Sequence, residues 1–462
     1  MREQPRNWRT RSCCCGPRTN LVQTRILAGR PRPNGRSPSA PWEEHDGLAY
    51  LSRLRLTNFR NLIHLDLALS TGVTVYYGPN AQGKTTLLEA VYLLCIARSF
   101  RAENEREVVN FEAAKAGEQA LVDGTINKDG QLLRVIVGYQ PTQRLNQLEE
   151  TGLAYSVRKE IRVNRIKRTA GELIGEVNAV LFSAADIDLV QGPPTGRRRF
   201  LDILLSQADS LYLKGLQRYH RVVQQRNQLL RLLREGRAER DELAFWDDEL
   251  VREGAWITWR RHETMLELTA ACGRHHRELS GPDEELTIDY RPSVPLADGV
   301  AGIEDNFREG LAAAVHRERA RPITAVGPHR DDFNLMIDGA DMGAFASRGQ
   351  ARTMALTLRL AEAEFLASVR GEGPVVLLDD ALSEMDSFRR HRLLEKATQY
   401  EQVLITTTDL EQVNDFFGSR AKYFYVSNGQ VWPSNRSGEV GDEPVSAPGF
   451  EDAGGQPIDE SP

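Results

Sequence analysis

The chain has 462 residues, 40% of them hydrophobic, and a formal net charge of -6 at pH 7. This length allows two or three domains with a large core, and the apolar content is ordinary for a soluble globular protein. No stretch reaches the length of a membrane span, and the five cysteines do not make a disulfide framework, so we expect a protein of the reducing cytoplasm with no membrane association.

The net charge is distributed unevenly along the chain. Residues 1–40 carry nine arginines and one acid, Glu3, so this segment has a charge of +8 and the remainder has -14. Residues 1–48 are rich in Arg, Pro and Gly and lack apolar periodicity, which predicts a disordered basic N-terminal extension. We interpret it as an over-extended translation start or a dispensable tail in preference to an arm that touches DNA. Contacts with nucleic acid must then come from local basic patches.

Strand patterning begins at Tyr50. Apolar and polar residues alternate around Leu54 and again around Leu67, which predicts half-buried antiparallel strands. Two further apolar runs flank the segment Asn127-Lys128-Asp129-Gly130, and Asp-Gly between alternating runs is a hairpin signal. A guanine-recognition motif would need Asp at the position of Gly130, so this segment is predicted to be a turn.

A phosphate-binding loop stands between an apolar run, residues 73–77, and an apolar helical stretch, residues 86–96. It follows the pattern G-x-x-x-x-G-K-[ST] in the strand-to-helix setting that this motif requires. The glycines let successive backbone N–H groups point at phosphate oxygens, and the helix N-terminus adds positive potential. Lys84 is assigned to the β- and γ-phosphates and the hydroxyl of Thr85 to Mg²⁺. The predicted nucleotide-binding residues are Gly78, Pro79, Asn80, Ala81, Gln82, Gly83, Lys84, Thr85 and Thr86.

The pattern changes between residues 198 and 279, where leucines and tryptophans recur at helical intervals among many charges. This predicts a helical domain inserted into an α/β one. Its two or three helices are expected to extend about 40–50 Å at most, too short for a long coiled-coil arm. The predicted domains are the basic extension 1–48, a first α/β lobe with the phosphate-binding loop 49–196, the helical insertion 197–285, a second α/β part 286–432 and a disordered acidic tail 433–462.

The second half of the predicted nucleotide site lies near residue 380. Residues 375–380 read Val-Val-Leu-Leu-Asp-Asp, as expected for a parallel strand that is buried on both faces and ends in two carboxylates. In an ATPase the first, Asp379, supports the Mg²⁺ shell and the second, Asp380, acts on the attacking water as the candidate base. The segment Ser347-Arg348-Gly349-Gln350 precedes a helical stretch, and it suits either a helix N-cap or a close approach to a phosphate.

These segments, in this order and with a helical insertion between them, resemble an ATP-binding-cassette ATPase. Four more segments resemble the bacterial RecF family, and the resemblance spans residues 50–432. The predicted fold class is therefore α/β, an ATP-binding-cassette head with a mixed sheet, an antiparallel subdomain and an inserted helical domain. The four segments are Leu51-Ser52-Arg53-Leu54-Arg55-Leu56 through Asn58-Phe59-Arg60-Asn61, Arg98-Ser99-Phe100-Arg101, Gly196-Arg197-Arg198-Arg199-Phe200-Leu201-Asp202 and Gly327-Pro328-His329-Arg330-Asp331-Asp332.

The resemblance implies an ATP-dependent DNA-binding recombination mediator of the nucleoid. Such a protein acts with RecO and RecR at gapped or single-stranded DNA and helps to load RecA, in replication, recombinational gap repair and SOS induction. The implied cofactors are ATP and Mg²⁺, and the implied assembly is an ATP-dependent head-to-tail homodimer. Each ATP would be held by the phosphate-binding loop of one subunit and by Ser347, Gly349 and Gln350 of the other, with Asp386 at the dimer seam. Loss of the γ-phosphate on hydrolysis would weaken this interface.

Two departures from the wider cassette family bear on the rate of hydrolysis. The second acid is Asp380 where many members have Glu, and the switch position in Thr406-Thr407-Thr408 has no His. A shorter carboxylate and the missing imidazole predict slow turnover. Together with the resemblance, this leads us to expect a slow, DNA-stimulated ATPase that serves as a dimerisation switch and not as a motor.

Three basic clusters are candidates for sequence-tolerant contacts with DNA phosphates. The preferred cluster is Arg197, Arg198 and Arg199, for which the other interpretation is an anchor of the helical domain. The other two clusters are Arg162, Arg165, Lys167 and Arg168, and Arg317, Arg319 and Arg321.

The alternative function is that of a structural chromosome ATPase of the SMC type, but the short insertion disfavours the long coiled-coil arms on which that function depends. A small-molecule P-loop kinase would not explain residues 347–350. A transporter subunit is disfavoured by the missing switch His.

Overall fold

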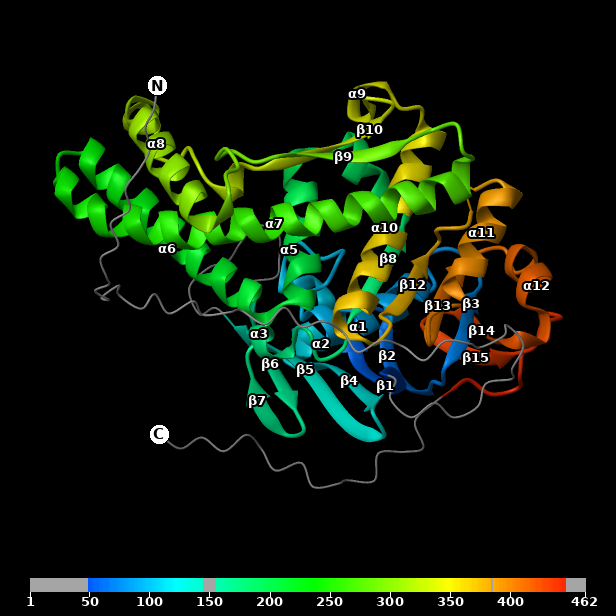
Figure 1. Ribbon diagram of the computed structural model, residues 1–462. Coiled ribbons are helices and arrows are strands. Elements are labelled where there is room, and N and C mark those ends of the chain that lie inside the picture. The colour runs from blue at the N-terminus through cyan, green and yellow to red at the C-terminus, as the bar shows by residue number, and fades with distance from the viewer. Residues whose placement is uncertain (1–48, 144–154, 384, 446–462) are drawn as a thin grey trace, which may run out of the picture. The chain divides into compact units, whose positions relative to one another are not determined.

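The computed structural model describes residues 49–143, 155–383 and 385–445. The predicted basic extension, residues 1–48, and the last part of the predicted acidic tail, residues 446–462, lie outside the described residues. Two six-stranded sheets, a three-stranded sheet and several long helices make up the described part of the chain (Figure 1).

The phosphate-binding loop and the Asp379 strand belong to one six-stranded sheet with the order β15-β14-β3-β13-β12-β8. Five of its strands are parallel, and β15 pairs antiparallel with β14 at the edge. Because the carboxyl ends of parallel strands meet at one edge, the loop after β3 and the acids after β12 are brought together. The strands are β3 (Gly72–Tyr77), β8 (Ala179–Ser183), β12 (Val375–Asp379), β13 (Gln402–Thr407), β14 (Ala421–Ser427) and β15 (Gln430–Ser434).

A second sheet, with the order β2-β1-β4-β5-β6-β7, is antiparallel throughout. It confirms the half-buried strands predicted after Tyr50. The predicted hairpin is also confirmed, since β4 and β5 are joined through Asp129 (φ 52°) and Gly130 (φ 74°), the paired positive φ values of a tight hairpin turn. The strands are β1 (Tyr50–Phe59), β2 (Leu62–Ala68), β4 (Ala120–Lys128), β5 (Gln131–Gln143), β6 (Tyr155–Val163) and β7 (Ile166–Arg168).

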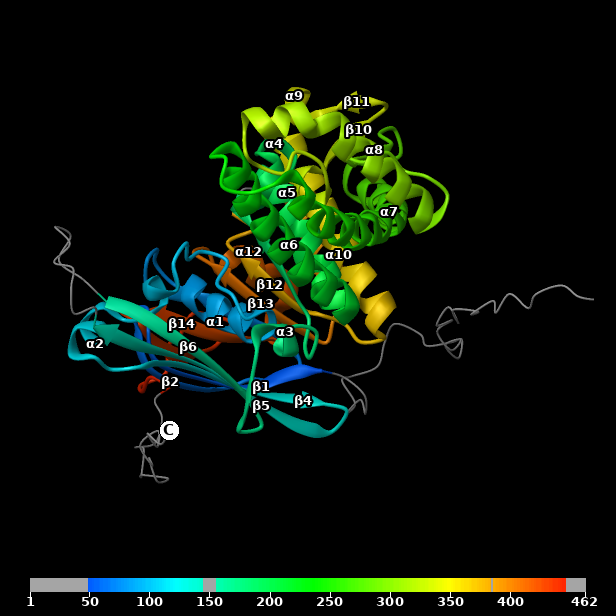
Figure 2. The same ribbon diagram turned by 90° about the vertical axis from the view of Figure 1, so that its left-hand side faces the viewer.

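Helix α1 (Lys84–Ile96) fills the space between these two sheets (Figure 2). Its apolar side chains pack with the antiparallel strands on one side and with Leu377 of β12 and Leu404 of β13 on the other. Nearly every residue of α1 is buried, which explains why its sequence is apolar all round and not amphipathic. The helix that begins at the phosphate-binding loop is therefore held rigidly.

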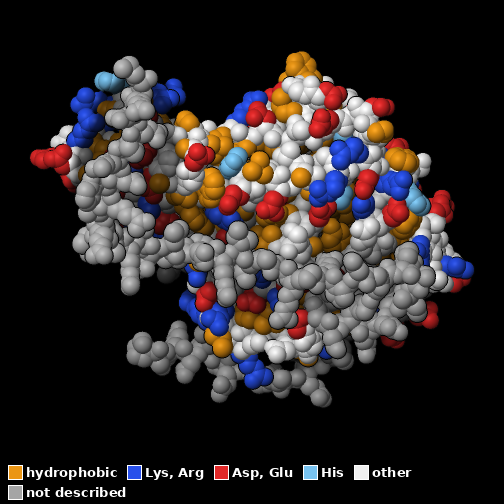
Figure 3. Space-filling model, in the orientation of Figure 1, with side chains coloured by type: hydrophobic (Ala, Val, Ile, Leu, Met, Phe, Trp, Pro, Cys, Tyr) orange, Lys and Arg blue, Asp and Glu red, His pale blue; other side chains and the backbone are white. Residues whose placement is uncertain are grey.

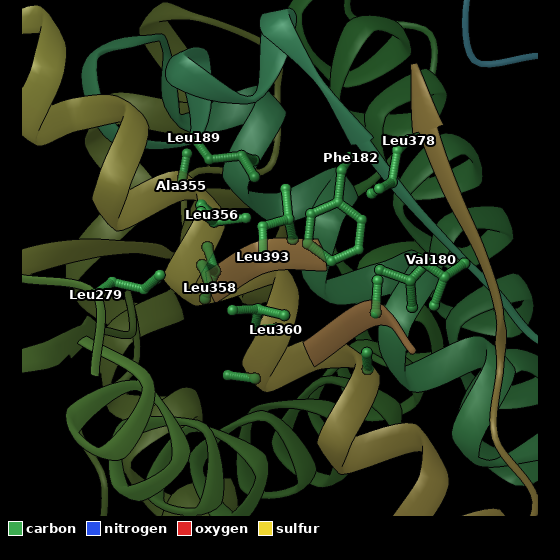
Figure 4. Close-up of a cluster of buried hydrophobic side chains, with 14 of the residues drawn as sticks. Val180, Phe182, Leu189, Leu279, Ala355, Leu356, Leu358, Leu360, Leu378 and Leu393 are labelled. Atoms are coloured by element: carbon green, nitrogen blue, oxygen red, sulfur yellow. The ribbon is translucent and has the colours of Figure 1, made fainter. Parts of the chain in front are cut away.

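The opposite face of the parallel sheet is covered by α10 (Arg348–Arg370), together with parts of α5 (Pro194–Ala208) and α7 (Leu243–Ser280). Figure 4 shows Leu356 and Leu360 of α10 in one apolar cluster with Val180 and Phe182 of β8. Because successive side chains of a strand point to opposite faces, β12 contributes Leu378 here and Leu377 to the α1 side. This confirms the prediction of a strand buried on both faces.

The helical insertion is larger than the sequence predicted. Helices α6 (Ser210–Arg234) and α7 pack along each other, and α7 has 38 residues. At 1.5 Å per residue, α7 is about 57 Å long, so the expected limit of 40–50 Å is wrong. A helix of this length persists because it joins two cores: its first half packs in the cluster around Tyr219 and Phe307, and its second half packs in the core under the sheet.

The predicted boundary at residue 286 is also wrong. Helix α8 (Gly299–Ala320) packs against α7 through Ile303 and Phe307, and so belongs to the helical part. The strands near it form a separate sheet with the order β11-β10-β9, and the parallel sheet resumes only at β12. The three strands are β9 (Leu286–Arg291), β10 (Asp332–Ile337) and β11 (Ala340–Asp341).

The predicted disordered tail begins too early. Strand β15 extends to Ser434, and the chain then folds back on it, since Gly441 N donates to Pro433 O (2.8 Å) and Val445 N donates to Val431 O (2.6 Å). The remaining short helices are α2 (Phe111–Ala116), α3 (Ala170–Leu173), α4 (Asp188–Gln191), α9 (Met342–Phe345), α11 (Ser387–Ala397) and α12 (Glu411–Phe417), with 3₁₀ turns η1 (Glu105–Val108), η2 (Ala184–Ile187), η3 (Arg240–Glu242), η4 (Pro328–Arg330) and η5 (Gly418–Arg420). In the described part of the chain, no helix combines the length and apolarity that crossing a bilayer requires.

A buried polar network ties the helical part to the small sheet. Arg261 of α7 donates to Asp331 Oδ2 (3.1 Å), to Pro328 O (2.6 Å) and to Asp202 Oδ1 of α5 (2.7 Å). Asp331 also accepts from Tyr290 Oη (2.6 Å), and both Arg261 and Asp331 are 1% exposed. The segment of residues 327–332, singled out by resemblance, is therefore a structural hub.

We expect His329 in this hub to make folding stability depend on pH. Its Nε2 lies 3.0 Å from Thr324 O and its Nδ1 lies 2.7 Å from Tyr219 Oη, so Nε2 carries the proton and Nδ1 accepts. Burial lowers the pKa of His329 from 6.5 to about 4. Between these values the unfolded chain binds the proton and the folded chain does not, so stability is full above pH 6.5 and falls as the pH drops, by about 2 kcal/mol at pH 5.

The measurement is urea unfolding of the wild type and of His329→Asn at pH 7 and pH 5. Between pH 7 and pH 5, the free energy of unfolding of the wild type should fall by about 2 kcal/mol more than that of the variant. The reason is that Asn can accept the hydrogen bond of Tyr219 but does not titrate. Equal losses in the two proteins would show that His329 does not carry this dependence.

Candidate nucleotide-binding site

A pocket of about 520 Å³ lies at the carboxyl edge of the parallel sheet, over the phosphate-binding loop. Its lining brings together predicted residues from the loop and from the end of β12, which are almost 300 positions apart in the sequence. The lining residues are Arg60, Asn61, Asn80, Ala81, Gly83, Lys84, Thr85, Thr86, Arg101, Asp380 and Thr406.

The loop depends on two glycines with positive φ, Gly78 (143°) and Gly83 (115°). A Cβ on Gly78 would meet Val426 O at 2.4 Å, and a Cβ on Gly83 would meet the Asn61 amide at 3.0 Å. Only glycine fits both the dihedral angles and the space. The loop after β3 therefore closes tightly enough to turn its backbone N–H groups inward, as a phosphate cradle needs.

Lys84, the first residue of α1, lies folded over the loop. Its Nζ donates to Gly78 O and Pro79 O, both at 2.7 Å, and the residue is 8% exposed. Burial lowers the pKa of Lys84, while the charges of Asp380 and Asp379 oppose this shift. The ammonium group thus stands between the loop and two carboxylates, where an anionic phosphate would compensate its burial.

Thr85 and Asp379, which the sequence analysis predicted to hold the metal, are in direct contact. Thr85 Oγ1 donates to Asp379 Oδ1 at 2.8 Å, and Thr406 Oγ1 of β13 donates to the same oxygen at 2.8 Å. Burial raises the pKa of Asp379, and these two hydrogen bonds work against that shift. A hydroxyl and a carboxylate oxygen in contact are a donor set that fits Mg²⁺, which prefers oxygen ligands and shares its shell with phosphates.

Asp380 is exposed at the pocket and has a positive φ of 49°. Its backbone N–H donates to Thr406 Oγ1 at 3.0 Å, so Thr406 contacts both acids at the strand end. The sharp turn directs the carboxylate away from the buried path of β12. A free carboxylate beside Lys84 and Thr85 is suitably placed to accept a proton from an attacking water.

The predicted signature residues lie at the exposed N-terminus of α10. Ser347 Oγ accepts from Gln350 N (3.2 Å) and Gln350 Oε1 accepts from Ser347 N (3.1 Å), so this segment is a reciprocal helix cap. Ser347, Gly349 and Gln350 are absent from the pocket lining. Asp386 also caps a helix, accepting from Arg389 N (2.9 Å) at the start of α11. Within one subunit, the structure does not bring the signature segment to the phosphate-binding loop.

The pocket contains basic residues that the sequence analysis did not assign to the site. Arg60 and Arg101 line it, and both approach Glu89 of α1, which is fully buried. Glu89 accepts from Arg60 Nε (2.5 Å) and from Ser99 Oγ (2.5 Å). Arg60 and Arg101 lie in two of the segments that resemble the RecF family. Their place in these segments is the sequence signal that could have assigned them to the site.

Arg101→Ala is expected to weaken ATP binding by about 10-fold, because it removes one charge-assisted contact worth ~1.4 kcal/mol from the pocket wall. The Arg101 side chain is 46% exposed, so stability should be unaffected. Arg106→Ala is the control, since Arg106 is exposed nearby and does not line the pocket. Titration with a fluorescent ATP analogue measures both affinities, and equal affinities would remove Arg101 from the site.

The structure places the three arginines of the preferred DNA-binding cluster in different environments. Arg197 is 7% exposed and pairs with Asp332 of β10 (Nε to Oδ1 2.6 Å), so its guanidinium cannot reach DNA, and the anchoring interpretation holds for it. Arg198 donates to Asp331 O (2.9 Å), whereas Arg199 is exposed. In the second cluster Arg162 and Lys167 pair with Glu160, and Arg168 pairs with Glu172. The third cluster, Arg317, Arg319 and Arg321, is exposed.

Known proteins resemble this chain over nearly all of its described length. The family model described as "RecF/RecN/SMC N terminal domain" matches residues 50–430. A protein of Herpetosiphon aurantiacus named "DNA replication and repair protein RecF" is 40% identical over 397 residues, covering 83% of this chain and 100% of that protein. A protein of the same name from Roseiflexus castenholzii is 41% identical over 402 residues, with the same coverage of 83% and 100%.

A solved structure described as "the recombination mediator protein RecF-ATP in RecFOR pathway" agrees in three dimensions. It has a TM-score of 0.75 and 32% identity, and the match covers 85% of this chain and 100% of that one. The corresponding structure with an ATP analogue, RecF-ATPrS, has a TM-score of 0.73 at 32% identity, over 84% and 99% of the two chains. Sequence, fold and the assembled phosphate-binding loop agree, and the chain belongs to the RecF family of DNA replication and repair proteins.

Proposed function

We propose that this protein is an ATP-dependent DNA-binding recombination mediator of the RecF type. It would act in DNA replication and gap repair, helping RecO and RecR to load RecA on gapped or single-stranded DNA. The observation that carries the proposal is the pocket in which Lys84, Thr85 and Asp380 meet, in a chain whose relatives are named for DNA replication and repair.

The phosphate-binding loop would hold ATP, and Thr85 and Asp379 would hold Mg²⁺ together with the phosphates. When bound, the metal neutralises charge on the β- and γ-phosphates. The chain's own residues do the rest: backbone N–H groups and Lys84 hold the phosphates, Arg60 and Arg101 supply charge at the pocket wall, and Asp380 accepts the proton of the attacking water. With an Asp in this place and Thr406 next to it, hydrolysis is slow and times the release of a complex.

The active form is a head-to-tail homodimer that closes on ATP. This part of the proposal is supported by the exposure of Ser347 and Gly349 at the N-terminus of a 23-residue helix, away from the pocket of their own subunit. Exposed N–H groups at a helix N-terminus favour a phosphate. A second subunit would place them over the γ-phosphate, with Asp386 at the seam.

The insertion separates this proposal from an SMC-type structural ATPase. The longest described helix, α7, has 38 residues, and both of its halves pack in hydrophobic clusters of its own chain. Long antiparallel arms that reach away from the head would instead need helices with solvent on most sides over many heptads.

The test is the sedimentation mass of the wild type, of Lys84→Ala and of Ser347→Arg, each with and without Mg-ATP and a gapped duplex. The wild type should change from a monomer to a DNA-bound dimer with ATP, and both variants should remain monomeric. Ser347→Arg should still bind ATP, since Ser347 is absent from the pocket, whereas Lys84→Ala should not. If the wild type binds neither DNA nor a second subunit under any condition, the mediator function is wrong and only nucleotide binding survives.

A further inference from the structure

A second pocket, of about 420 Å³, lies at the other end of the P-loop helix. Residues from the C-terminal half of α1, from most of the length of α5, from α6 and from the segment after α3 line it. Its floor is apolar, formed by Tyr92, Ile96, Ile203 and Leu216, and its rim is basic. The rim residues are Arg98, Thr195, Arg198, Arg199 and His220.

Two guanidinium groups at this rim, those of Arg98 and Arg199, have no ion-pair partner within the described part of the chain. Among the described residues, neither Arg98 nor Arg199 makes an ion pair or a side-chain hydrogen bond. Arg199 is exposed at the rim but partly desolvated at its base, which lowers its pKa, and the positive charge of Arg98 lowers that pKa further. Two like charges held together without an acid are unfavourable, so the pair is stabilised by any anion that enters between them.

The acid of this pocket does not fill that role. Asp202 lines it, but this carboxylate pairs with Arg261, whose Nη2 donates to Oδ1 (2.7 Å), and the same oxygen accepts from Tyr212 Oη (2.9 Å), so the charge of Asp202 is compensated within the buried network. Arg198 is likewise occupied, because its Nη1 donates to Asp331 O. The cations left for a ligand are Arg98 and Arg199, with His220 exposed at the edge.

We propose that the pocket between Arg98 and Arg199 binds a phosphate group of the DNA backbone. Planar guanidinium forks suit the bidentate recognition of phosphate oxygens. The hydroxyl of Thr195, in the first turn of a 15-residue helix, adds a neutral donor of the kind that positions DNA phosphates. The inference rests on the proposed function, which makes DNA the phosphate source, and it extends the predicted cluster by adding Arg98 and removing Arg197.

The charge of the rest of the molecule favours a local site for a polyanion. The face in Figure 3 carries Lys and Arg side chains interspersed with Asp and Glu, and residues 41–462 have a net charge of -14 by the sequence. A polyanion is repelled by this balance as a whole. It can be held only where cations stand unpaired, as Arg98 and Arg199 do.

The experiment compares the full-length wild type with Arg98→Ala/Arg199→Ala in binding to a labelled gapped duplex over a series of salt concentrations. The variant should bind about 10- to 100-fold more weakly, and the slope of log K against log[salt] should fall in magnitude by about 1, the effect of one lost phosphate contact. Arg98→Lys/Arg199→Lys should keep the wild-type slope, since counterion release depends on charge.

Arg291→Ala/Arg308→Ala is the matched control, because it removes two charges from arginines that are 52% exposed and already ion-paired. It should leave affinity and slope unchanged. A wild-type slope in Arg98→Ala/Arg199→Ala would overturn the inference while the mediator function stands.

ATP titration of the same variants separates the possible sources of the phosphate. Loss of ATP affinity with unchanged DNA binding would assign the pocket to free nucleotide and overturn the inference. A wild type that fails to bind DNA at all would overturn both the inference and the mediator function.

Discussion

Asp380→Asn is expected to lower the rate of ATP hydrolysis by about 10²–10⁴-fold, the usual effect of losing a general base. Asparagine has nearly the same shape but cannot accept the proton of the attacking water. ATP should still bind, because the phosphate cradle and the Thr85–Asp379 pair are unchanged. If hydrolysis times the release of the dimer, the variant should remain dimeric on DNA for longer than the wild type. Single-turnover hydrolysis and dissociation from a gapped duplex measure the two effects.

Asp379→Asn is the matched comparison, since it changes the neighbouring carboxylate in the same way. Its oxygen accepts from both Thr85 and Thr406 at 2.8 Å, so its loss should weaken the binding of Mg-ATP itself. The two variants should therefore differ: Asp379→Asn should weaken the binding of Mg-ATP, whereas Asp380→Asn should slow the chemical step. An unchanged single-turnover rate in Asp380→Asn would mean that another group acts on the water.

Asp331→Ala is expected to destabilise the protein by about 3–5 kcal/mol, the cost of removing one partner from a buried ion pair. Arg261 would keep only Asp202 as a counter-charge, and Tyr290 Oη and Ser293 N would each lose an acceptor. Burial raises the cost because an unpaired charge in a dry interior is poorly solvated. Urea unfolding followed by tryptophan fluorescence is the measurement, since Trp246, Trp256 and Trp259 all lie on α7.

The control is Asp289→Ala on the neighbouring strand β9. Asp289 pairs with Arg291 at 2.7 Å, but the side chains are 47% and 52% exposed, so this pair should contribute about 0–1 kcal/mol. If Asp331→Ala and Asp289→Ala lowered the free energy of unfolding by equal amounts, burial would not be the reason that the network around Asp331 stabilises the protein. A large loss at Asp331 with intact nucleotide binding would confirm that residues 327–332 support the fold and do not form part of the ATP site.

The helical insertion was predicted only in part from the spacing of apolar residues. Periodicity predicted that helices would follow residue 197, and α5 and α7 confirm this. It did not predict that α8 would join them after an intervening strand, because apolar spacing states which face of a helix is buried and not what buries it. Phe307 of α8 and Tyr219 of α6 meet in one cluster although they are far apart in the chain.

The candidate nucleotide site could be predicted largely from the sequence. The phosphate-binding loop needs only Gly78, Gly83 and Lys84 between a strand and a helix, and the Asp379–Asp380 pair needs only a buried strand before it. Such features follow from backbone conformation and from a short apolar run, which neighbouring residues decide. Parallel pairing of β3, β13 and β12 then places both halves at one edge.

The roles of the arginines were decided only by the tertiary structure. Arg197 and Arg199 are two residues apart in a basic run, yet one is buried against Asp332 and the other lines a pocket together with Arg98. Arg60 lines the candidate nucleotide pocket, and its guanidinium pairs with the buried Glu89 of α1. The free energy of a charged side chain depends on its burial and on the charges that surround it. Those surroundings come from strands and helices distant in sequence, so the same basic run contains both a buried, ion-paired arginine and an exposed arginine at a pocket.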